Sequence, residues 1–310
     1  MRPLKERLYE TFSDIKADVS LAPYTSFKAG GRALFFLETG REEDIITLFK
    51  LQEEIPFTIG FLGKGTNLLI NDTVINKVVV RYQPQDPVTF ADNNRVIIKS
   101  GCLLQEALHL CLSNNRAGLE GAAGIPGTVG GAVCMNASSG LGYVTSCLEG
   151  VNIITGHDCG FRTKEELALT YRSSNIRPDE FIASAVFELP EVDDKAVSVI
   201  RQKIKKHLQQ RRSRQPLSCP SFGSVFKNPP GHSAGELIEK AGLKGVSLGD
   251  VQIATRHANF IINKGRGQAR QAYELIQLAA KKVWQHSGIR LQREVVLWGF
   301  SDSDSKAMIL

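Results

Sequence analysis

The sequence predicts an α+β protein with a larger first part and a smaller C-terminal domain. Short runs of β-branched and aromatic residues alternate with stretches of helical periodicity over residues 34–114. A second set of strands and helices follows a long amphipathic helix at residues 193–214. The chain has 310 residues, of which 42% are hydrophobic and 23% charged. That composition is ordinary for a soluble globular protein, and the length suffices for two or three packed domains.

In the first part, strands are expected where apolar runs are bounded by turn residues. Helices are expected where apolar residues recur every three or four positions, as Leu104, Leu108 and Cys111 do. The expected strands are 34–38, 57–62, 77–81 and 95–100, and the expected helices are 41–54 and 103–114.

Clear start and stop signals mark the second part. Ser233 and Glu236 form a capping-box pattern that opens a helix, and Gly242 closes it. The other expected elements are a strand at 181–189, helices at 193–214 and 268–286, strands at 258–262 and 291–298, and a frayed tail at 301–310.

The chain is mildly basic. Its net charge is +6, from 38 Lys and Arg against 32 Asp and Glu. The 193–214 helix carries many of these charges on one face, which suits either nucleic acid or a solvated surface. No aromatic side chains are interleaved with the basic ones, so we favour the solvated surface and expect no nucleic-acid partner.

Cysteine usage and the N-terminus bear on the compartment. The six cysteines form no CxxC pair, and no apolar segment follows the basic residues at the start. We expect reduced thiols, no bound metal and a cytoplasmic protein. Residues 121–148 are uncharged and long enough to span a bilayer. However, their seven glycines and Pro126 make a poor helix. We expect a buried glycine-rich loop system there and no membrane partner.

Two glycine-rich loops have the character of phosphate-binding backbone. They are LGKGTNLLI (62–70) and GLEGAAGIPGTVGGAVCMNA (118–137). Backbone N–H groups in such loops can surround a phosphate, because glycine has no Cβ to block the approach. Together the loops suit a pyrophosphate joined to a flat apolar ring, although tight glycine turns would give the same composition. The first loop is neither a GxGxxG nor a Walker A sequence, which disfavours a Rossmann or P-loop fold.

Seven segments carry a resemblance to a known family. They are YTSFKAGGRA (24–33), LGKGTNLLI (62–70), GIPGTVGGAVCMNA (124–137), YRSS (171–174), GSVFKNP (223–229), HANFIIN (257–263) and LQREV (291–295). In this order and spacing they resemble the bacterial UDP-N-acetylenolpyruvoylglucosamine reductase (MurB) family, over residues 20–300. The short interval between Tyr171 and Ser224 resembles the subclass that lacks an extra tyrosine-bearing loop over the substrate.

The resemblance implies a fold and a domain division. It implies a two-lobed FAD-binding domain of the vanillyl-alcohol-oxidase (PCMH) type, followed by a C-terminal α+β substrate domain. We therefore expect the FAD-binding domain over residues 1–200, with lobes of about 1–90 and 91–200. The substrate domain is expected over 201–310, with its last strand returning toward the flavin.

The resemblance also implies an activity. The chain would be an NADPH-dependent flavoenzyme that reduces UDP-N-acetylglucosamine enolpyruvate to UDP-N-acetylmuramate in peptidoglycan precursor synthesis. The hydride would pass from NADPH through FAD, since no amino acid side chain supplies one. The implied partners are the UDP-sugar and NADPH, and we expect a monomer.

Three residues match the family's catalytic positions. Ser224 would donate a proton to the basic carbanion left by hydride transfer, although a turn serine is more often a cap or a solvated hydroxyl. Arg172 presents a planar fork of donors suited to the substrate carboxylate. Glu294 would lie beside developing negative charge, so we expect it to be protonated or paired with a donor. Without the motifs, a surface ion pair and a strand-end carboxylate would be the simpler interpretations of Arg172 and Glu294.

Further contacts are implied at positions that match the family's loops. The residues expected to bind FAD are Gly63, Lys64, Gly65, Thr66, Asn67, Leu68, Gly124, Ile125, Pro126, Gly127, Gly130, Gly131, Asn136, Ala137 and Arg211. The residues expected to bind substrate are Tyr171, Arg214, Lys227 and Asn228.

The chain departs from the usual family pattern in two places. Residues 138–141 read Ser-Ser-Gly-Leu where Gly-Ala-Tyr-Gly is usual, which removes an aromatic side chain near the flavin loop. Asn175 and Ile176 stand where a phenylalanine is usual. Two alternative functions are an FAD oxidase on the same scaffold and a basic nucleic-acid-binding module. GSVFKNP and Glu294 disfavour the oxidase, and the module leaves both glycine loops unexplained.

Overall fold

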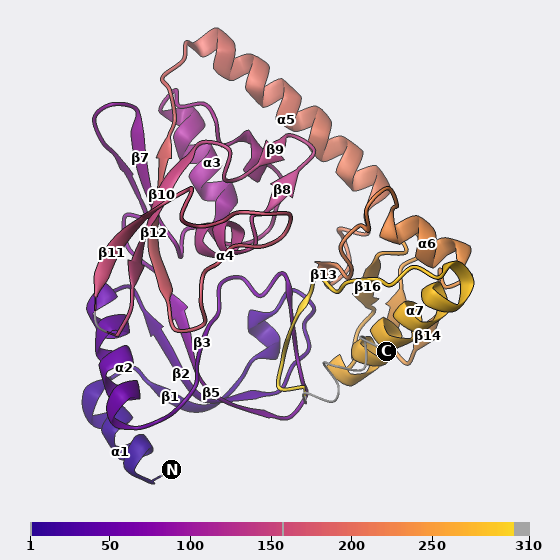
Figure 1. Cartoon of the computed structure of the whole chain (residues 1–310), viewed down its shortest axis with the longest axis horizontal. Coiled ribbons are helices and arrows are strands. Elements are labelled where there is room, and N and C mark those ends of the chain that lie inside the picture. Colours follow the sequence, from indigo (N-terminus) through magenta and orange to yellow (C-terminus); the bar gives the residue numbers. More distant parts are fainter. Residues whose placement is uncertain (1, 157, 301–310) are drawn as a thin grey trace. The chain divides into compact units, whose positions relative to one another are not determined.

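The structure is a computed structural model that describes residues 2–156 and 158–300 (Figure 1). The backbone divides into two compact units, each assembled from three separate stretches of the chain. Unit 1 comprises Met1–Lys16, Phe35–Gly63 and Lys77–Gln210, and unit 2 comprises Ala17–Leu34, Lys64–Asn76 and Arg211–Leu310. The predicted frayed tail at 301–310 lies outside the described residues.

Unit 1 contains a five-stranded antiparallel sheet in the order β11-β10-β12-β7-β6. Its strands are β6 (Val88–Phe90), β7 (Arg95–Lys99), β10 (Leu148–Ile154), β11 (Cys159–Thr163) and β12 (Phe181–Glu188). Residues 181–187 of the central strand β12 are all buried. The short helix α4 (Val129–Cys134) packs on β12, and the rings of Phe61 and Tyr82 lie 4.7 and 5.4 Å from that of Phe181. Such unbroken burial is typical of a strand covered on both faces.

Further helices and strands complete unit 1. They are α1 (Arg2–Thr11), α2 (Glu42–Glu54), β3 (Ile59–Phe61), α3 (Leu104–Ser113), the 3-10 turn η2 (Glu120–Ala122), β8 (Ser138–Ser139), β9 (Gly142–Tyr143) and α5 (Asp194–Arg214), whose last turn belongs to unit 2. A second sheet has the order β1-β2-β5-β3, with β1 (Lys16–Ser20), β2 (Arg32–Thr39) and β5 (Val74–Tyr82). The division between the units falls within β1, β2 and β5.

Unit 2 is built on an antiparallel sheet in the order β13-β16-β15-β14, against which α7 packs. Its elements are η1 (Ala22–Tyr24), β4 (Leu68–Ile70), β13 (Ser221–Ser224), α6 (Ala234–Lys240), β14 (Ser247–Leu248), β15 (Val251–Ile253), β16 (Phe260–Asn263), α7 (Ala269–Ser287) and β17 (Val296–Trp298). The Asp72 carboxylate accepts hydrogen bonds of 3.0 Å from the N–H groups of Ala269 and Arg270, where the first turn of α7 favours negative charge. Gly288 ends α7 in the left-handed conformation, with φ 69°.

The long helices agree with the sequence prediction, while two predicted segments need correction. Helices α2, α3, α5 and α7 begin and end within one residue of their expected bounds. The expected strand over 291–298 is wrong in its first part, because only Val296–Trp298 is a strand. The N–H groups of Glu294 and Val295 both point to Val225 O, at 2.8 and 3.4 Å, which breaks the regular ladder. Residues 121–148 are not all loop, since they contain α4 and the β8–β9 hairpin.

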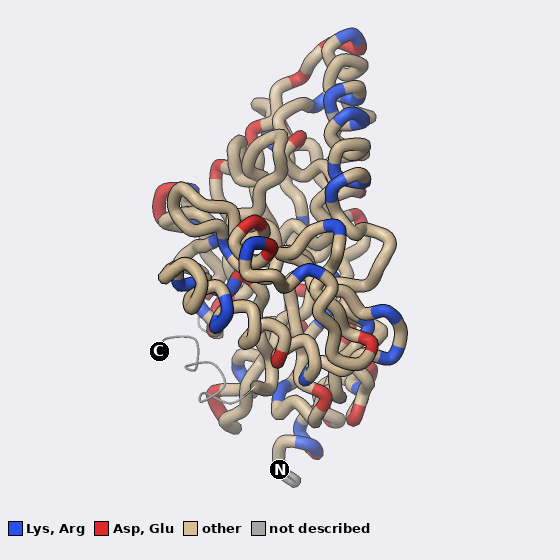
Figure 2. Tube along the Cα trace, turned by 90° about the vertical axis from the view of Figure 1, so that its right-hand side faces the viewer, with Lys and Arg blue, Asp and Glu red and all other residues tan. Residues whose placement is uncertain are grey.

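Helix α5 is exposed along most of its length. Val197 is its buried residue, and Ile200 and Ile204 pack partly buried against the core of unit 1. Figure 2 shows Lys and Arg positions, in blue, distributed along the helix. This arrangement is compatible with the solvated-surface interpretation, which stays a prediction. Within the described residues, no helix is both long and apolar enough to cross a membrane. Those same residues contain no group of three His, Cys, Asp or Glu side chains placed to hold a metal ion.

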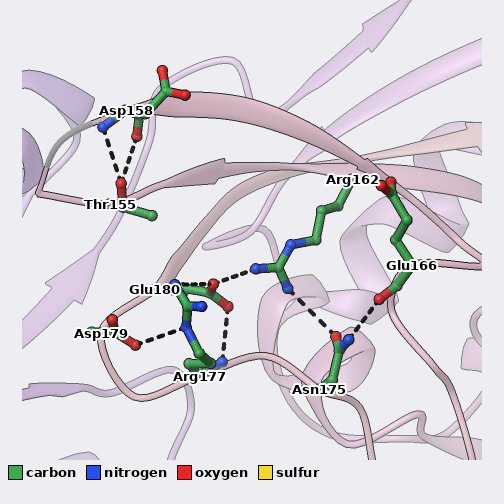
Figure 3. Close-up of polar contacts among 8 residues, drawn as sticks. All are labelled: Thr155, Asp158, Arg162, Glu166, Asn175, Arg177, Asp179 and Glu180. Carbon is green, nitrogen blue, oxygen red and sulfur yellow. Dashed lines mark hydrogen bonds and ion pairs between the residues drawn. The ribbon is translucent and has the colours of Figure 1, made fainter.

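A buried carboxylate joins β11 to the segment that follows the YRSS motif (Figure 3). The Glu180 side chain has no exposed surface and pairs with Arg162 of β11 and with Arg177, whose Nη2 lies 2.9 Å away. The N–H of Arg177 donates to the other carboxylate oxygen at 2.9 Å. Arg162 also donates to Asn175 Oδ1 at 3.4 Å, and Asn175 Nδ2 donates to Glu166 O at 2.6 Å. These contacts fix the chain between the YRSS motif and β12.

Replacing Glu180 by glutamine is expected to lower the free energy of unfolding by about 2–3 kcal/mol, because an amide cannot balance two guanidinium groups. A fully buried pair would lose more, but the Arg177 side chain is 60% exposed and solvent screens its charge. Urea unfolding measures the loss. Asp179→Asn makes the same change of charge at a side chain that is 68% exposed, and it should cost less than about 0.5 kcal/mol. Equal losses in the two variants would contradict the structural role of Glu180.

Candidate active site

In unit 1, the loop after β3 and the start of α4 pack closely enough to require glycine. A Cβ on Gly63 would lie 2.6 Å from Thr128 Oγ1, and a Cβ on Gly130 would lie 2.7 Å from Ser100 Cβ. Thr128 is the N-cap of α4, and its Oγ1 accepts a hydrogen bond from Gly131 N at 3.5 Å. Gly63 therefore serves the packing of this loop against Thr128, and Gly130 serves the packing of α4 against Ser100, the residue that follows β7.

The second glycine-rich loop is held by contacts within unit 1. Gly124 N donates to Gln105 Oε1 at 3.3 Å, and Gln105 Nε2 donates to Ile125 O at 3.1 Å. Gly130 N donates to Ser100 O at 2.9 Å. Gly127 has φ 143°, a conformation that glycine adopts readily and other residues rarely do. The loop is thus ordered by its own contacts, which engage the N–H groups of Gly118, Gly124, Gly130 and Gly131.

In unit 2, Ser26 joins the loop at Gly65 to strand β13. Gly65 has φ 60°, and a Cβ on it would lie 2.5 Å from Tyr24 O. The N–H of Ser26 donates to Gly65 O at 3.1 Å, and the Ser26 hydroxyl lies 3.1 Å from Gly65 O and 2.5 Å from Ser221 O. A Cβ on Gly223 would lie 3.6 Å from Thr66 O. The loop expected to bind FAD and the strand that ends at Ser224 are therefore neighbours.

Ser224 and Glu294 are brought together by the backbone of Val225. Ser224 is the last residue of β13, and Glu294 N donates to Val225 O at 2.8 Å. The buried Asn259 fixes the next residue, since its Nδ2 donates to Phe226 O at 2.8 Å and its Oδ1 accepts from Phe226 N at 3.0 Å. Val225 N donates to Asn259 O at 2.9 Å. Two of the three predicted catalytic residues thus lie on adjacent, fixed backbone in unit 2.

The 64–70 segment is hydrogen-bonded to the segment that contains Glu294. Asn67 Nδ2 donates to Glu294 O at 3.2 Å, and Val296 N donates to Asn67 O at 3.0 Å. From there β4 and β17 pair in parallel, with Leu68 opposite Val296. The structure therefore links two predicted flavin-binding residues, Asn67 and Leu68, to the segment that carries Glu294.

Arg172 lies at the tip of a tight turn in unit 1. Thr170 and Ser173 exchange backbone hydrogen bonds of 3.0 and 3.2 Å, which leaves Tyr171 and Arg172 as the central residues. Arg172 has φ 59°, a conformation that glycine or asparagine usually takes at the second central position. For an arginine it costs about 1–2 kcal/mol. A backbone outlier of this size supports a functional role, since the fold must compensate for it elsewhere.

Two side chains from the 136–145 segment hold this turn. Asn136 is buried; its Nδ2 donates to Thr170 O at 2.8 Å, and its Oδ1 accepts from Thr145 Oγ1 at 2.5 Å. Arg172 Nη1 donates to Ser138 Oγ at 2.8 Å, and the guanidinium lies 5.2 Å from the centroid of the Tyr171 ring. Asn136, which the sequence predicts as a flavin contact, therefore uses its amide on the turn that carries Arg172.

The remaining predicted contacts lie at several places in unit 2. Arg211 is half-buried and donates to Gln215 Oε1 at 3.0 Å, and burial lowers the pKa of its guanidinium. Asn228 Oδ1 accepts from Ala234 N at 3.0 Å, at the start of α6. Lys227 N donates to Gln292 O at 2.8 Å. The other two, Lys64 and Arg214, are exposed. The structure thus places Lys227 beside the segment of Glu294 and gives Asn228 a helix-capping contact.

The predicted catalytic residues fall into two groups. Ser224 and Glu294 belong to unit 2, and Arg172 belongs to unit 1. Within each unit the supporting residues include some for which no role was predicted, namely Ser26, Thr128 and Asn259. Thr128 precedes a short apolar helix, which is an N-cap pattern. The hydrogen-bond partners of Ser26 and Asn259 are 195 and 33 residues away in the sequence. No local sequence pattern predicts contacts over such separations.

Comparison with known proteins places the chain in a family. The FAD binding domain family matches residues 33–158, and the UDP-N-acetylenolpyruvoylglucosamine reductase C-terminal domain family matches residues 215–298. These matches confirm the predicted combination of an FAD-binding domain with a C-terminal domain in an α+β protein.

Individual relatives extend the match to nearly the whole chain. The UDP-N-acetylenolpyruvoylglucosamine reductase of Clostridium novyi (strain NT) is 37% identical over 290 residues, which cover 92% of each chain. That of Moorella thermoacetica is 38% identical over 283 residues, covering 90% of this chain and 91% of its own. The crystal structure of the Thermus caldophilus reductase (MurB) superimposes with a TM-score of 0.77 at 30% identity and covers 92% of this chain and 98% of its own. The resemblance seen in the motifs is thereby confirmed, and the chain belongs to the UDP-N-acetylenolpyruvoylglucosamine reductase family.

Proposed function

We propose that this chain is a UDP-N-acetylmuramate dehydrogenase. It reduces UDP-N-acetylglucosamine enolpyruvate to UDP-N-acetylmuramate in peptidoglycan precursor synthesis, with FAD as its cofactor and NADPH as the reductant. Membership of the reductase family supports the reaction class. The observation that carries the assignment of residues is the hydrogen bond of 2.8 Å between Glu294 N and Val225 O, which holds the backbone of Glu294 next to the segment that contains Ser224.

The residues of the chain fit an FAD dinucleotide. Gly65 has a positive φ and packs without a Cβ against Tyr24, and Gly63 does so against Thr128. The second loop also has glycines with positive φ, Gly124 at 73° and Gly127 at 143°. Glycine-rich backbone of this kind accommodates a phosphate, because no Cβ blocks its approach. Burial lowers the pKa of Arg211, so a bound diphosphate would offset the cost of burying its charge. The loops at 63–68, 124–131 and 136–137, together with Arg211, would hold the cofactor.

Three side chains act on the substrate in this mechanism. FAD, when bound, would supply the hydride that the terminal vinyl carbon of the substrate requires. Ser224 then gives its hydroxyl proton to the carbon that bears the carboxylate; that carbon is basic enough to take a proton from an alcohol. Arg172 binds the substrate carboxylate, onto which negative charge spreads, and stabilises that charge through its planar fork of donors. Glu294 contributes as a protonated or paired carboxyl group.

Finer assignments follow the same proposal. Tyr171, Arg214, Lys227 and Asn228 would contact the UDP-sugar. The chain would belong to the subclass without the extra tyrosine loop and work as a monomer in the cytoplasm. Residues 1–200 would form the FAD-binding domain and residues 201–310 the substrate domain. Support for this division comes from the two family matches, at 33–158 and 215–298.

An anaerobic titration tests the proposed function. We expect purified protein to be yellow, to lose its flavin absorbance on addition of NADPH, and to regain it when the enolpyruvyl sugar is added, with one UDP-N-acetylmuramate formed per flavin. Recovery of colour with oxygen but not with the sugar would favour an oxidase. A folded protein that neither contains nor binds FAD would contradict the proposal.

A further inference from the structure

We infer that Ser138 is a positioning residue for Arg172. The inference deepens the proposed function and rests on the role given there to Arg172. Its basis is the hydrogen bond of 2.8 Å from Arg172 Nη1 to Ser138 Oγ.

Arg172 needs an anchor because its side chain is long and lies at the tip of a turn. An arginine side chain has about 2 kcal/mol of rotamer entropy to lose when it is ordered. The backbone at φ 59° fixes where the side chain begins but not where the guanidinium ends. Ser138 holds one of the five N–H donors, and the ring of Tyr171 lies against the guanidinium at 5.2 Å. The Arg172 guanidinium is therefore already oriented before the substrate carboxylate binds.

Ser138 can serve as an anchor because it is itself fixed. It pairs with Tyr143 across the β8–β9 hairpin, and the next backbone bond, from Val144 N to Ala137 O, measures 2.8 Å. Two residues earlier, the buried Asn136 bonds Thr170 O, at the base of the Arg172 turn. The hairpin segment therefore holds the turn at two levels, with Asn136 on its backbone and Ser138 on its guanidinium.

The test is a double-mutant cycle on the reduced, FAD-loaded enzyme. Ser138→Ala is expected to slow reoxidation by the enolpyruvyl sugar about tenfold, the size of effect expected when a charged hydrogen bond is lost. Reduction by NADPH and the melting temperature should stay unchanged. In an Arg172→Ala background the same substitution should have no further effect. Ser138→Thr, which keeps the hydroxyl, should restore most of the rate.

Ser139→Ala is the matched control, since the Ser139 hydroxyl accepts from Leu141 N at 3.1 Å and not from Arg172. Its reoxidation rate should equal that of the unmodified protein. If Ser138→Ala also reoxidises at the normal rate while Arg172→Ala is slow, the anchoring role is wrong and the role of Arg172 stands. If Arg172→Ala is itself normal, the proposed role of Arg172 fails and the inference fails with it. Additive losses in the double variant would also overturn the inference.

Discussion

Ser224→Ala is expected to reduce its flavin with NADPH at the normal rate and to reduce the enolpyruvyl sugar about 100-fold to 10,000-fold more slowly. That range is typical for the loss of a general acid. The substitution removes a hydroxyl and leaves the backbone intact, because the neighbouring residues are held independently. Val225 N donates to Asn259 O at 2.9 Å, and both polar groups of the Phe226 backbone bond the Asn259 side chain. The loss should therefore appear in one half-reaction and not in folding.

Rapid mixing under nitrogen separates the two half-reactions of this variant. Ser221→Ala is the matched control, since it deletes a hydroxyl from the same strand, three residues from Ser224. It should reduce and reoxidise normally, because Ser221 takes part in the contact with Ser26 through its carbonyl oxygen. A normal rate of product formation in Ser224→Ala would show that the proton comes from another group.

The sequence predicts the long helices well, because their signals are local. In α7, Ala272, Ile276, Ala279 and Val283 recur at helical spacing, and all four are buried. Gly288 ends the helix in the left-handed conformation that glycine favours. Such periodicity and end signals are contained within about twenty residues. They need no knowledge of what the helix packs against.

The short strands cannot be predicted in this way, because they form only through hydrogen bonds to partner strands that lie elsewhere in the sequence. Strands β13, β14 and β15 have between two and four residues each, too few for an alternating pattern to show. The segment from Leu291 to Val295 has the composition of a strand but not its hydrogen bonding, since Glu294 N and Val295 N share one acceptor. The amino-acid composition of this segment does not reveal such a bulge. The interleaving of the two units is likewise a property of long-range contacts.

The candidate site divides in the same way. Ser224, Arg172 and Glu294 could be chosen from the sequence only through the family motifs, since each has a simpler structural interpretation. The contact between Arg172 and Ser138 joins residues 34 positions apart. The positive φ of Arg172 has no sequence signal at all, because glycine or asparagine would be expected there. The positive φ of Arg172 allows a prediction about stability that could not be made from the sequence motif.

Arg172→Gly is expected to slow reduction of the enolpyruvyl sugar about 100-fold to 1,000-fold, the cost typical of removing one pre-aimed group that stabilises developing charge. Arg172→Ala should lose the same amount of activity, since both variants lack the guanidinium. Their stabilities should differ. Alanine keeps the unfavourable φ of 59°, whereas glycine relieves it. Even after allowing for the greater freedom of glycine in the unfolded chain, we expect the glycine variant to be about 1 kcal/mol more stable than the alanine variant.

Comparing these two variants separates backbone strain from side-chain chemistry, because they share every lost contact of the arginine and differ only in a methyl group. Urea unfolding measures the first quantity, and reoxidation of the reduced flavin by the enolpyruvyl sugar measures the second. Arg172→Lys completes the set, since it keeps the positive charge but not the planar fork, and it should regain little activity. If the alanine variant were the more stable, the turn would not be strained. If lysine restored the rate, charge alone would suffice, and the orientation that Ser138 gives to the guanidinium would have no catalytic consequence.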